Sequence, residues 1–274
     1  MRRLIIRPGA IGDCILALPA IEHLRAGFTE VWVSSRNLPL IRFADRVRAI
    51  PSTGLDLAGI PGVEPPAALM ETLAEFDSIV SWYGTNRPEF RAAMAGLPFE
   101  FLPALPEEGA GVHAADFYLR QVGGKGPAIP RIDCKRTPGD YVVIQPFSGS
   151  ARKNWPLERF RALARELNGP VQWCAGPEEE LEGAVRIDDL YELACWIAGA
   201  RLYIGNDSGI THLAAAAGAP VVALFGPTDP AIWAPRGERV RIVATARPGE
   251  PIENLTIERV LAAVREAEVS LVGE

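Results

Sequence analysis

The residue types best suited to chemistry gather in a polar turn within the stretch 203–229, between two short apolar segments. The turn consists of residues that favour turns and helix caps, Asn206, Asp207, Ser208 and Gly209. An Ala-rich run follows the turn and predicts a helix. A helix that begins beyond a parallel strand attracts anions at its N-terminus, so the amides after Ser208 are candidate phosphate ligands.

Two side chains of this stretch admit more than one interpretation. A carboxylate repels phosphate, so we expect Asp207 to cap the helix, to bond a sugar hydroxyl or to bond Lys153. His212 lies in the first helical turns, where it is either a ligand of the same site or a packing side chain. Capping alone would also explain Asp207 and Ser208, because such residues are the general preference at a helix start.

A second polar loop offers hydroxyls, flexible amides and two cations. Its candidate ligands are Ser148, Ser150, Arg152 and Lys153. This set suits a diphosphate, and Arg152 and Lys153 would offset the charge that develops on a departing phosphate. A solvated loop with surface cations would carry the same residues. The loop is not a P-loop, because the pattern GxxxxGK[ST] is absent.

Two more carboxylates follow predicted strands. Asp13, on a glycine-containing turn with Gly12, either caps the next helix or acts as a general base toward an attacking hydroxyl. Glu178 either binds the hydroxyls of a ribose or is one of three solvated glutamates at 178–180. Ligands gather beyond the carboxyl ends of parallel strands, so these turns would border one cleft if two domains face each other.

The elements that must position these turns alternate between strand and helix. Strands are predicted near 4–6, 30–34, 47–51, 78–82, 99–102, 141–145, 171–174, 201–205, 221–225 and 240–243. Helices are predicted near 14–24, 39–43, 67–76, 113–122, 156–167, 190–198, 210–217 and 256–268. Pro19 predicts a kink in the first helix or a later start. The alternation predicts two Rossmann-like α/β domains, 1–135 and 136–274, joined by the Pro- and Gly-rich segment 123–139.

Composition excludes several classes of protein. The chain has 274 residues, of which 48% are hydrophobic and 23% charged, as in a globular protein. A net charge of -6 argues against nucleic acid as a partner. The four cysteines show no CxxC spacing and no His partner at metal-ligand spacing, which predicts reduced thiols in the cytoplasm and no metal site. The N-terminus predicts a strand instead of a signal peptide, and no apolar run reaches transmembrane length.

Three motifs resemble those of one family, the ADP-heptose:lipopolysaccharide heptosyltransferases. The segments 206–216 and 220–230 are similar to the family's signature. Gly12-Asp13 with Leu16 and 18–20 resembles its opening turn, and Ser148-Gly-Ser with 153–156 and Phe160 resembles its third motif. The matches run in the family's order from residue 3 to about residue 235.

The resemblance implies a GT-B fold, in which two Rossmann-like domains present parallel sheets to one another across a cleft. The first domain would hold the acceptor and the second the nucleotide sugar, and the last helix, about 256–268, would return to the first domain. It implies an inverting, metal-independent transfer of heptose from an ADP-linked donor, without a separate cofactor, to a hydroxyl of a lipopolysaccharide-like or other glycan acceptor. Peripheral contact with the inner membrane face stays open.

Carried over residue by residue, Asp13 matches the catalytic base and Lys153 the phosphate-binding lysine. Glu178 matches a ribose-binding glutamate. The remaining residues of the implied nucleotide-sugar site are Gly12, Ser148, Ser150, Arg152, Asp207, Ser208, Gly209 and His212. The chain is short for the family, and the missing length falls in the first half. A nucleotide-sugar-binding protein without transferase activity therefore remains the alternative, with a sugar epimerase as a further reading on fold analogy.

Overall fold

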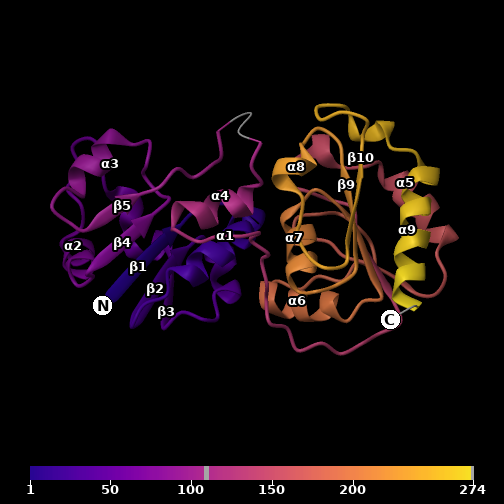
Figure 1. Ribbon diagram of the computed structural model, residues 1–274, viewed down its shortest axis with the longest axis horizontal. Helices are drawn as coiled ribbons and strands as arrows, with labels where there is room; N and C mark the ends of the chain where they lie inside the picture. The colour runs from indigo at the N-terminus through magenta and orange to yellow at the C-terminus, as the bar shows by residue number, and fades with distance from the viewer. Residues whose placement is uncertain (108–110, 273–274) are drawn as a thin grey trace. The chain divides into compact units, whose positions relative to one another are not determined.

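The computed structural model describes residues 1–107 and 111–272, apart from the side chains of residues 270–272. The chain divides into two compact units, Met1–Ala128 and Ile129–Glu274, each built on one five-stranded parallel sheet (Figure 1). The two Rossmann-like α/β domains predicted from the alternation are confirmed. The division falls after Ala128, before the expected boundary at 135/136. The residues between the two boundaries contact the second unit, since the amide of Ile132 donates to the carbonyl of Ala216 at 2.8 Å.

The sheet of the first unit has the order β3-β2-β1-β4-β5. Its strands are β1 (Arg2–Arg7), β2 (Phe28–Val33), β3 (Arg46–Ala49), β4 (Ser78–Ser81) and β5 (Phe99–Phe101). Its helices are α1 (Ile11–His23), α2 (Ala67–Ala74), α3 (Pro88–Ala93) and α4 (Ala114–Gln121), with short 3-10 helices η1 (Ser35–Leu40), η2 (Ile50–Thr53) and η3 (Leu55–Leu57).

Helices cover both faces of this sheet. Leu4, Ile6, Trp32 and Ile79 pack with side chains of α2 and α3, while α1 and α4 contact each other on the opposite side of the strands (Figure 1). The helix predicted at 14–24 is confirmed, although it does not start later as Pro19 suggested, and the α-helix predicted at 39–43 was wrong. The helix α1 begins at Ile11 and runs through Pro19, because its buried side holds it on the sheet although one hydrogen bond is missing. The helix expected at 39–43 is the 3-10 helix η1, which ends at Leu40.

The sheet of the second unit has the order β10-β9-β8-β6-β7. Its strands are β6 (Val142–Gln145), β7 (Val171–Trp173), β8 (Leu202–Asn206), β9 (Val221–Phe225) and β10 (Val240–Ala244). Its helices are α5 (Leu157–Glu166), α6 (Leu190–Ala198), α7 (Gly209–Ala216), α8 (Pro230–Trp233) and α9 (Ile257–Val272), with 3-10 helices η4 (Ala151–Lys153) and η5 (Ile252–Asn254).

In the second unit, α5 and α9 cover one face of the sheet and α6 and α7 the other (Figure 1). The apolar side of α9, with Val260, Val264 and Ala267, lies in the same core as Ile144 and Leu224. This side of α9 covers the sheet of its own unit.

The first strand of each unit lies inside its sheet, with one later strand on either side. β1 lies between β2 and β4, and β6 lies between β7 and β8, all in parallel register. The chain leaves the first strand toward one neighbour and returns later on its other side. Such a reversal of strand order marks the place where open α/β sheets bind ligands, beyond the carboxyl ends of the strands. The turn after β1 and the loops after β6 and β8 occupy these two places.

Candidate functional site

An ion pair joins the loop after β6 to the turn after β8. Lys153 Nζ lies 2.7 Å from Asp207 Oδ2. The Asp207 side chain is 6% exposed, whereas the Lys153 side chain is 33% exposed. Contact with Lys153 was one of the three roles expected for Asp207. The buried carboxylate therefore holds a cation whose ammonium group still reaches solvent, at the reversal of strand order.

The turn after β8 starts helix α7 with a side-chain cap. Ser208 is the N-cap residue, and its Oγ accepts the amide of Thr211 at 3.3 Å. The same hydroxyl lies 3.1 Å from Thr211 Oγ1 and 3.4 Å from Gln145 Oε1. Gly209 is the first residue of α7, and its amide belongs to the orphan donors of the helix start. The capping prediction for Ser208 is confirmed, and it leaves the first amides of α7 for an anion.

Internal contacts shape the loop after β6. Ser148 Oγ lies 2.8 Å from the carbonyl oxygen of Ser150 and 2.7 Å from Asn154 Oδ1, and the amide of Ser150 donates back to Ser148 Oγ at 3.3 Å. The amide of Lys153 donates to the carbonyl of Ser150 at 2.9 Å and closes the turn of η4. The Ser148 hydroxyl thus serves the loop itself, while Arg152 on the same turn is exposed.

Two further candidates for the donor site, Glu178 and His212, differ in how exposed they are. Glu178 is exposed beyond the carboxyl end of β7, next to β6 in the sheet, while Glu179 accepts the amide of Gly176 at 2.7 Å. Among the described residues, Glu178 and Arg152 have no hydrogen bond or ion pair. His212 is buried within α7, at 5% exposure. Glu178 is therefore available to a ligand, whereas His212 lies mostly inside the protein.

The turn after β1 holds Asp13 against the start of α1. Asp13 Oδ2 accepts the amide of Ala10 at 3.0 Å, which confirms that the side chain caps its own helix. Gly9 has φ +119°, and a methyl group there would lie 2.8 Å from Asp13 Cβ. The carbonyl of Gly9 accepts the hydroxyl of Ser34 at 2.8 Å. Gly12 lies in the first turn of α1, directly before Asp13.

The buried side chain of Arg7 contacts the same turn. Arg7 is 2% exposed, and its Nη2 donates to the backbone carbonyl of Asp13 at 3.2 Å. Its guanidinium lies over the ring of Tyr118 at 4.4 Å and over that of Trp82 at 5.7 Å. Burial raises the pKa of the Tyr118 hydroxyl, the Arg7 cation opposes the rise, and the Asp13 carboxylate adds to it. The position of Asp13 therefore depends on β1, α1 and α4 together.

Sequence reasoning assigned Asn206 to the turn and did not single out Gln145, and it counted neither of these buried polar residues among the site residues. Asn206, the last residue of β8, is fully buried and bonds both ends of the loop after β6. Gln145, the last residue of β6, is 3% exposed and lies beside Ser208. The sequence does hold a signal for both residues. Each is an amide side chain at the end of an otherwise apolar strand, where a buried polar group needs a hydrogen-bond partner.

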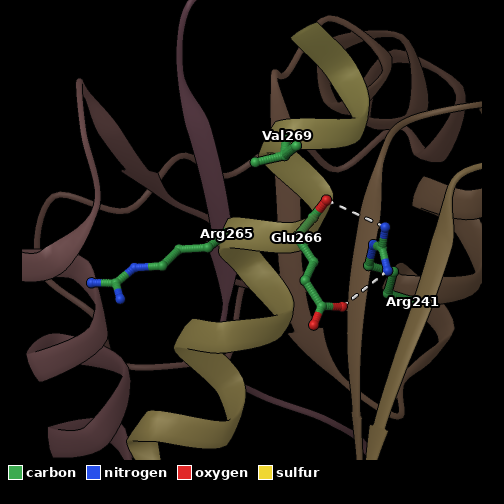
Figure 2. A pocket seen from close by; sticks show the side chains of 4 residues that line it. All are labelled: Arg241, Arg265, Glu266 and Val269. Carbon is green, nitrogen blue, oxygen red and sulfur yellow. Dashed lines mark hydrogen bonds and ion pairs between the residues drawn. The ribbon is translucent and has the colours of Figure 1, made fainter. Parts of the chain in front are cut away.

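A hollow of about 410 Å³ lies on α9 and β10, and none of the predicted site residues is among the residues that line it. It is lined by Arg241, Arg265, Glu266 and Val269 (Figure 2). Arg241 is bound to Glu266 through its side chain at 3.2 Å and its backbone carbonyl at 3.3 Å, and Figure 2 shows Arg265 pointing away from that pair. We assign no ligand to this hollow.

Within residues 1–107 and 111–272, no three His, Cys, Asp or Glu side chains are arranged to hold a metal ion. Over the same residues, every helix is too short or too polar to cross a membrane.

Comparison with known proteins identifies relatives of the second unit. Residues 127–258 match glycosyltransferase family 9 (heptosyltransferase). Lipopolysaccharide heptosyltransferase 1 of Escherichia coli O18:K1:H7 is 30% identical over 143 residues, which cover 47% of this chain and 43% of that protein. Lipopolysaccharide heptosyltransferase 2 of Escherichia coli K12 is 35% identical over 104 residues, which cover 38% of this chain and 26% of that protein. The matched part thus spans less than half the length of these curated relatives.

Solved structures match the whole chain. A glycosyltransferase of family 9 from Veillonella parvula has a TM-score of 0.76 at 17% identity, covering 98% of this chain and 97% of that one. The ADP-heptose lipopolysaccharide heptosyltransferase II of E. coli has a TM-score of 0.72 at 17% identity, covering 99% and 100%. These similarities confirm the GT-B fold. The sequence match covers the loop with Lys153 and the turn with Asp207, and residues 127–258 are a glycosyltransferase family 9 (heptosyltransferase) domain.

Proposed function

We propose that this protein is a glycosyltransferase that moves heptose from an ADP-linked donor to a hydroxyl of a lipopolysaccharide-type glycan. The observation that carries the proposal is the contact between Lys153 and Asp207 at the N-terminus of α7, where strand order reverses. The family 9 domain supports the choice of sugar transfer. A solved relative of this fold is described as E. coli heptosyltransferase WaaC with ADP, which supports adenine as the donor base.

The second unit would bind the diphosphate of the donor. Lys153 is one-third exposed, so its ammonium group can turn from Asp207 toward a phosphate oxygen without crossing the core. The first amides of α7 add donors and the positive end of the helix dipole. Ser150 and the exposed Arg152 belong to the same loop, and Glu178 would take the ribose hydroxyls. Asp207 would keep Lys153 in place without touching the phosphate.

The first unit would supply the base. The oxygen of the acceptor hydroxyl attacks the anomeric carbon, the bond from that carbon to the phosphate oxygen breaks, and the hydroxyl proton passes to the Asp13 carboxylate. The leaving ADP carries the negative charge, which Lys153 and the amides of α7 stabilise. A single displacement from the face opposite the diphosphate inverts the anomeric centre. No step of this scheme requires a metal ion.

The test measures ADP binding and sugar transfer with the same variants. We expect Lys153→Met to weaken ADP binding by about 10- to 100-fold in titration calorimetry, since a charge-assisted hydrogen bond contributes about 1.5–3 kcal/mol. The matched control is Lys135→Met, which removes an exposed lysine of the same unit and should leave ADP affinity unchanged.

Transfer is followed as ADP release from ADP-heptose in the presence of a heptose-deficient lipopolysaccharide acceptor. We expect Asp13→Asn to lower kcat by about 10²- to 10⁴-fold while ADP affinity is kept, because general base catalysis contributes that range. Tight ADP binding by the unaltered chain with no acceptor-dependent ADP release would refute the transferase and leave a binding protein. Unchanged transfer in Asp13→Asn would refute the base.

A further inference from the structure

Asn206 connects the two parts of the proposed donor site although it has no exposed surface. It is the last residue of β8 and is 0% exposed. Its Nδ2 donates to the carbonyl of Pro146 at 2.7 Å, and its Oδ1 accepts the amide of Trp155 at 3.0 Å. Pro146 and Trp155 are the two ends of the loop that carries Lys153. One side chain therefore pins both ends of this loop to the strand that leads into Asp207.

The backbone of Asn206 is itself held from two sides. Its carbonyl accepts the hydroxyl of Thr211 in α7. The amide of the next residue, Asp207, donates to the carbonyl of Leu224 in β9 at 2.9 Å. The strand end, the start of α7 and the neighbouring strand thus form a rigid frame, and the loop after β6 is attached to that frame through the Asn206 amide.

A purely structural role would make Asn206 a satisfied polar group that stabilises the unit and nothing more. Burial of Trp155 and the hydrogen bond from its indole Nε1 to the carbonyl of Leu255 at 2.9 Å also fix one end of the loop. The geometry points to a further role for Asn206, because its side chain is what bonds both ends of the loop to the strand that leads into Asp207. Ser148 bonds within the loop, and Gly149 has no neighbouring atom within 4 Å of a built Cβ. Within the described residues, the other side-chain contact between this loop and the end of β8 is the ion pair of Lys153 with Asp207. Asn206 therefore helps to set the separation between Lys153 and the start of α7.

We propose that Asn206 is a positioning residue for the donor diphosphate, which it never touches. It places the Lys153 ammonium group and the α7 amides at the spacing that one diphosphate can bridge. The inference rests on the proposed function, since it assumes that Lys153 binds the donor. Loss of the side-chain amide would let the loop move relative to α7, and ADP affinity would fall even where the protein remains folded.

The experiment is a double-mutant cycle on ADP affinity, with Asn206→Ala and Lys153→Met singly and together. Calorimetry is run at a temperature where circular dichroism shows all four proteins folded. We expect Asn206→Ala to weaken ADP binding by about 10-fold, in line with two lost hydrogen bonds. In the Lys153→Met background, Asn206→Ala should lower ADP affinity by less than about 2-fold, because Asn206 acts through Lys153 and that side chain is gone.

Asn206→Ser provides the second variant if Asn206→Ala does not fold, since a short hydroxyl side chain stays neutral and polar at this buried place but is too short to bond both Pro146 and Trp155. Exposed Asn254→Ala is the control and should change nothing. A lower melting temperature with unchanged ADP affinity in the Asn206 variants would overturn the inference, as would fully additive losses. An unchanged affinity in Lys153→Met would instead refute the donor site, and the role of Asn206 with it.

Discussion

The variant Gly9→Ala tests whether the conformation of the turn after β1 determines the position of the Asp13 carboxylate. The backbone at Gly9 has φ +119°, a value that glycine adopts freely and other residues rarely do. A methyl group would lie 2.8 Å from Asp13 Cβ and 2.9 Å from Asp13 Oδ2. Ordinary contact begins at 3.4 Å, so Asp13 or the turn must move by about 0.6 Å. The atoms that must give way belong to the carboxylate proposed as the base.

The expected effects on stability and activity differ in size. Holding a residue other than glycine in this conformation costs about 1–3 kcal/mol of the free energy of unfolding. Displacement of the carboxylate should lower kcat by about 10²-fold, because an error of about 1 Å in a catalytic group has that effect. ADP affinity should stay unchanged, because Lys153 and the start of α7 lie in the other unit.

The assay is acceptor-dependent ADP release, with urea unfolding measured in parallel. Gly96→Ala is the matched control, because Gly96 also has a positive φ, +86°, while its added methyl group would meet no atom within 4 Å. Both variants should lose stability, and only Gly9→Ala should lose transfer. A Gly9→Ala protein with the original kcat would refute the reasoning, and so would an equal loss of kcat in Gly96→Ala.

Two further predictions concern stability. Burial raises the pKa of the Cys14 and Cys174 thiols from 9.0 to about 12, so the free energy of unfolding should be steady below pH 9 and fall as the pH rises toward 12. The slope should reach about 1.4 kcal/mol per pH unit for each thiol, and urea midpoints that do not change from pH 8 to 10.5 would contradict this. Glu30 is fully buried between Arg46 at 3.5 Å, Arg48 at 3.0 Å and the Trp32 indole at 2.8 Å. Glu30→Ala should therefore lower the free energy of unfolding by about 2–4 kcal/mol with ADP affinity kept, and a loss below about 1 kcal/mol would show that the cluster contributes little.

The sequence by itself determined the strands, the longer helices and the places where chemistry is possible. β-branched and apolar runs such as 142–144 and 221–225 lie in the sheet interior, because strands covered on both faces must be apolar. The polar turns after β1, β6 and β8 carry Asp13, Lys153 and Ser208 at the carboxyl ends of strands, as expected. These features depend on neighbours within a few residues, and local preference and hydrophobic pattern encode such neighbours well.

Tertiary structure decided how those places are held. Pro19 stays inside α1 because packing on the sheet outweighs one missing hydrogen bond, which no local rule states. The contact of Lys153 with Asp207 was one of three alternatives for the aspartate, and only the pairing of β6 with β8 selects it. Asn206 bonds residues 51 and 60 positions away along the chain. Such contacts form only after strand order brings distant segments together, so the residue types alone do not specify them.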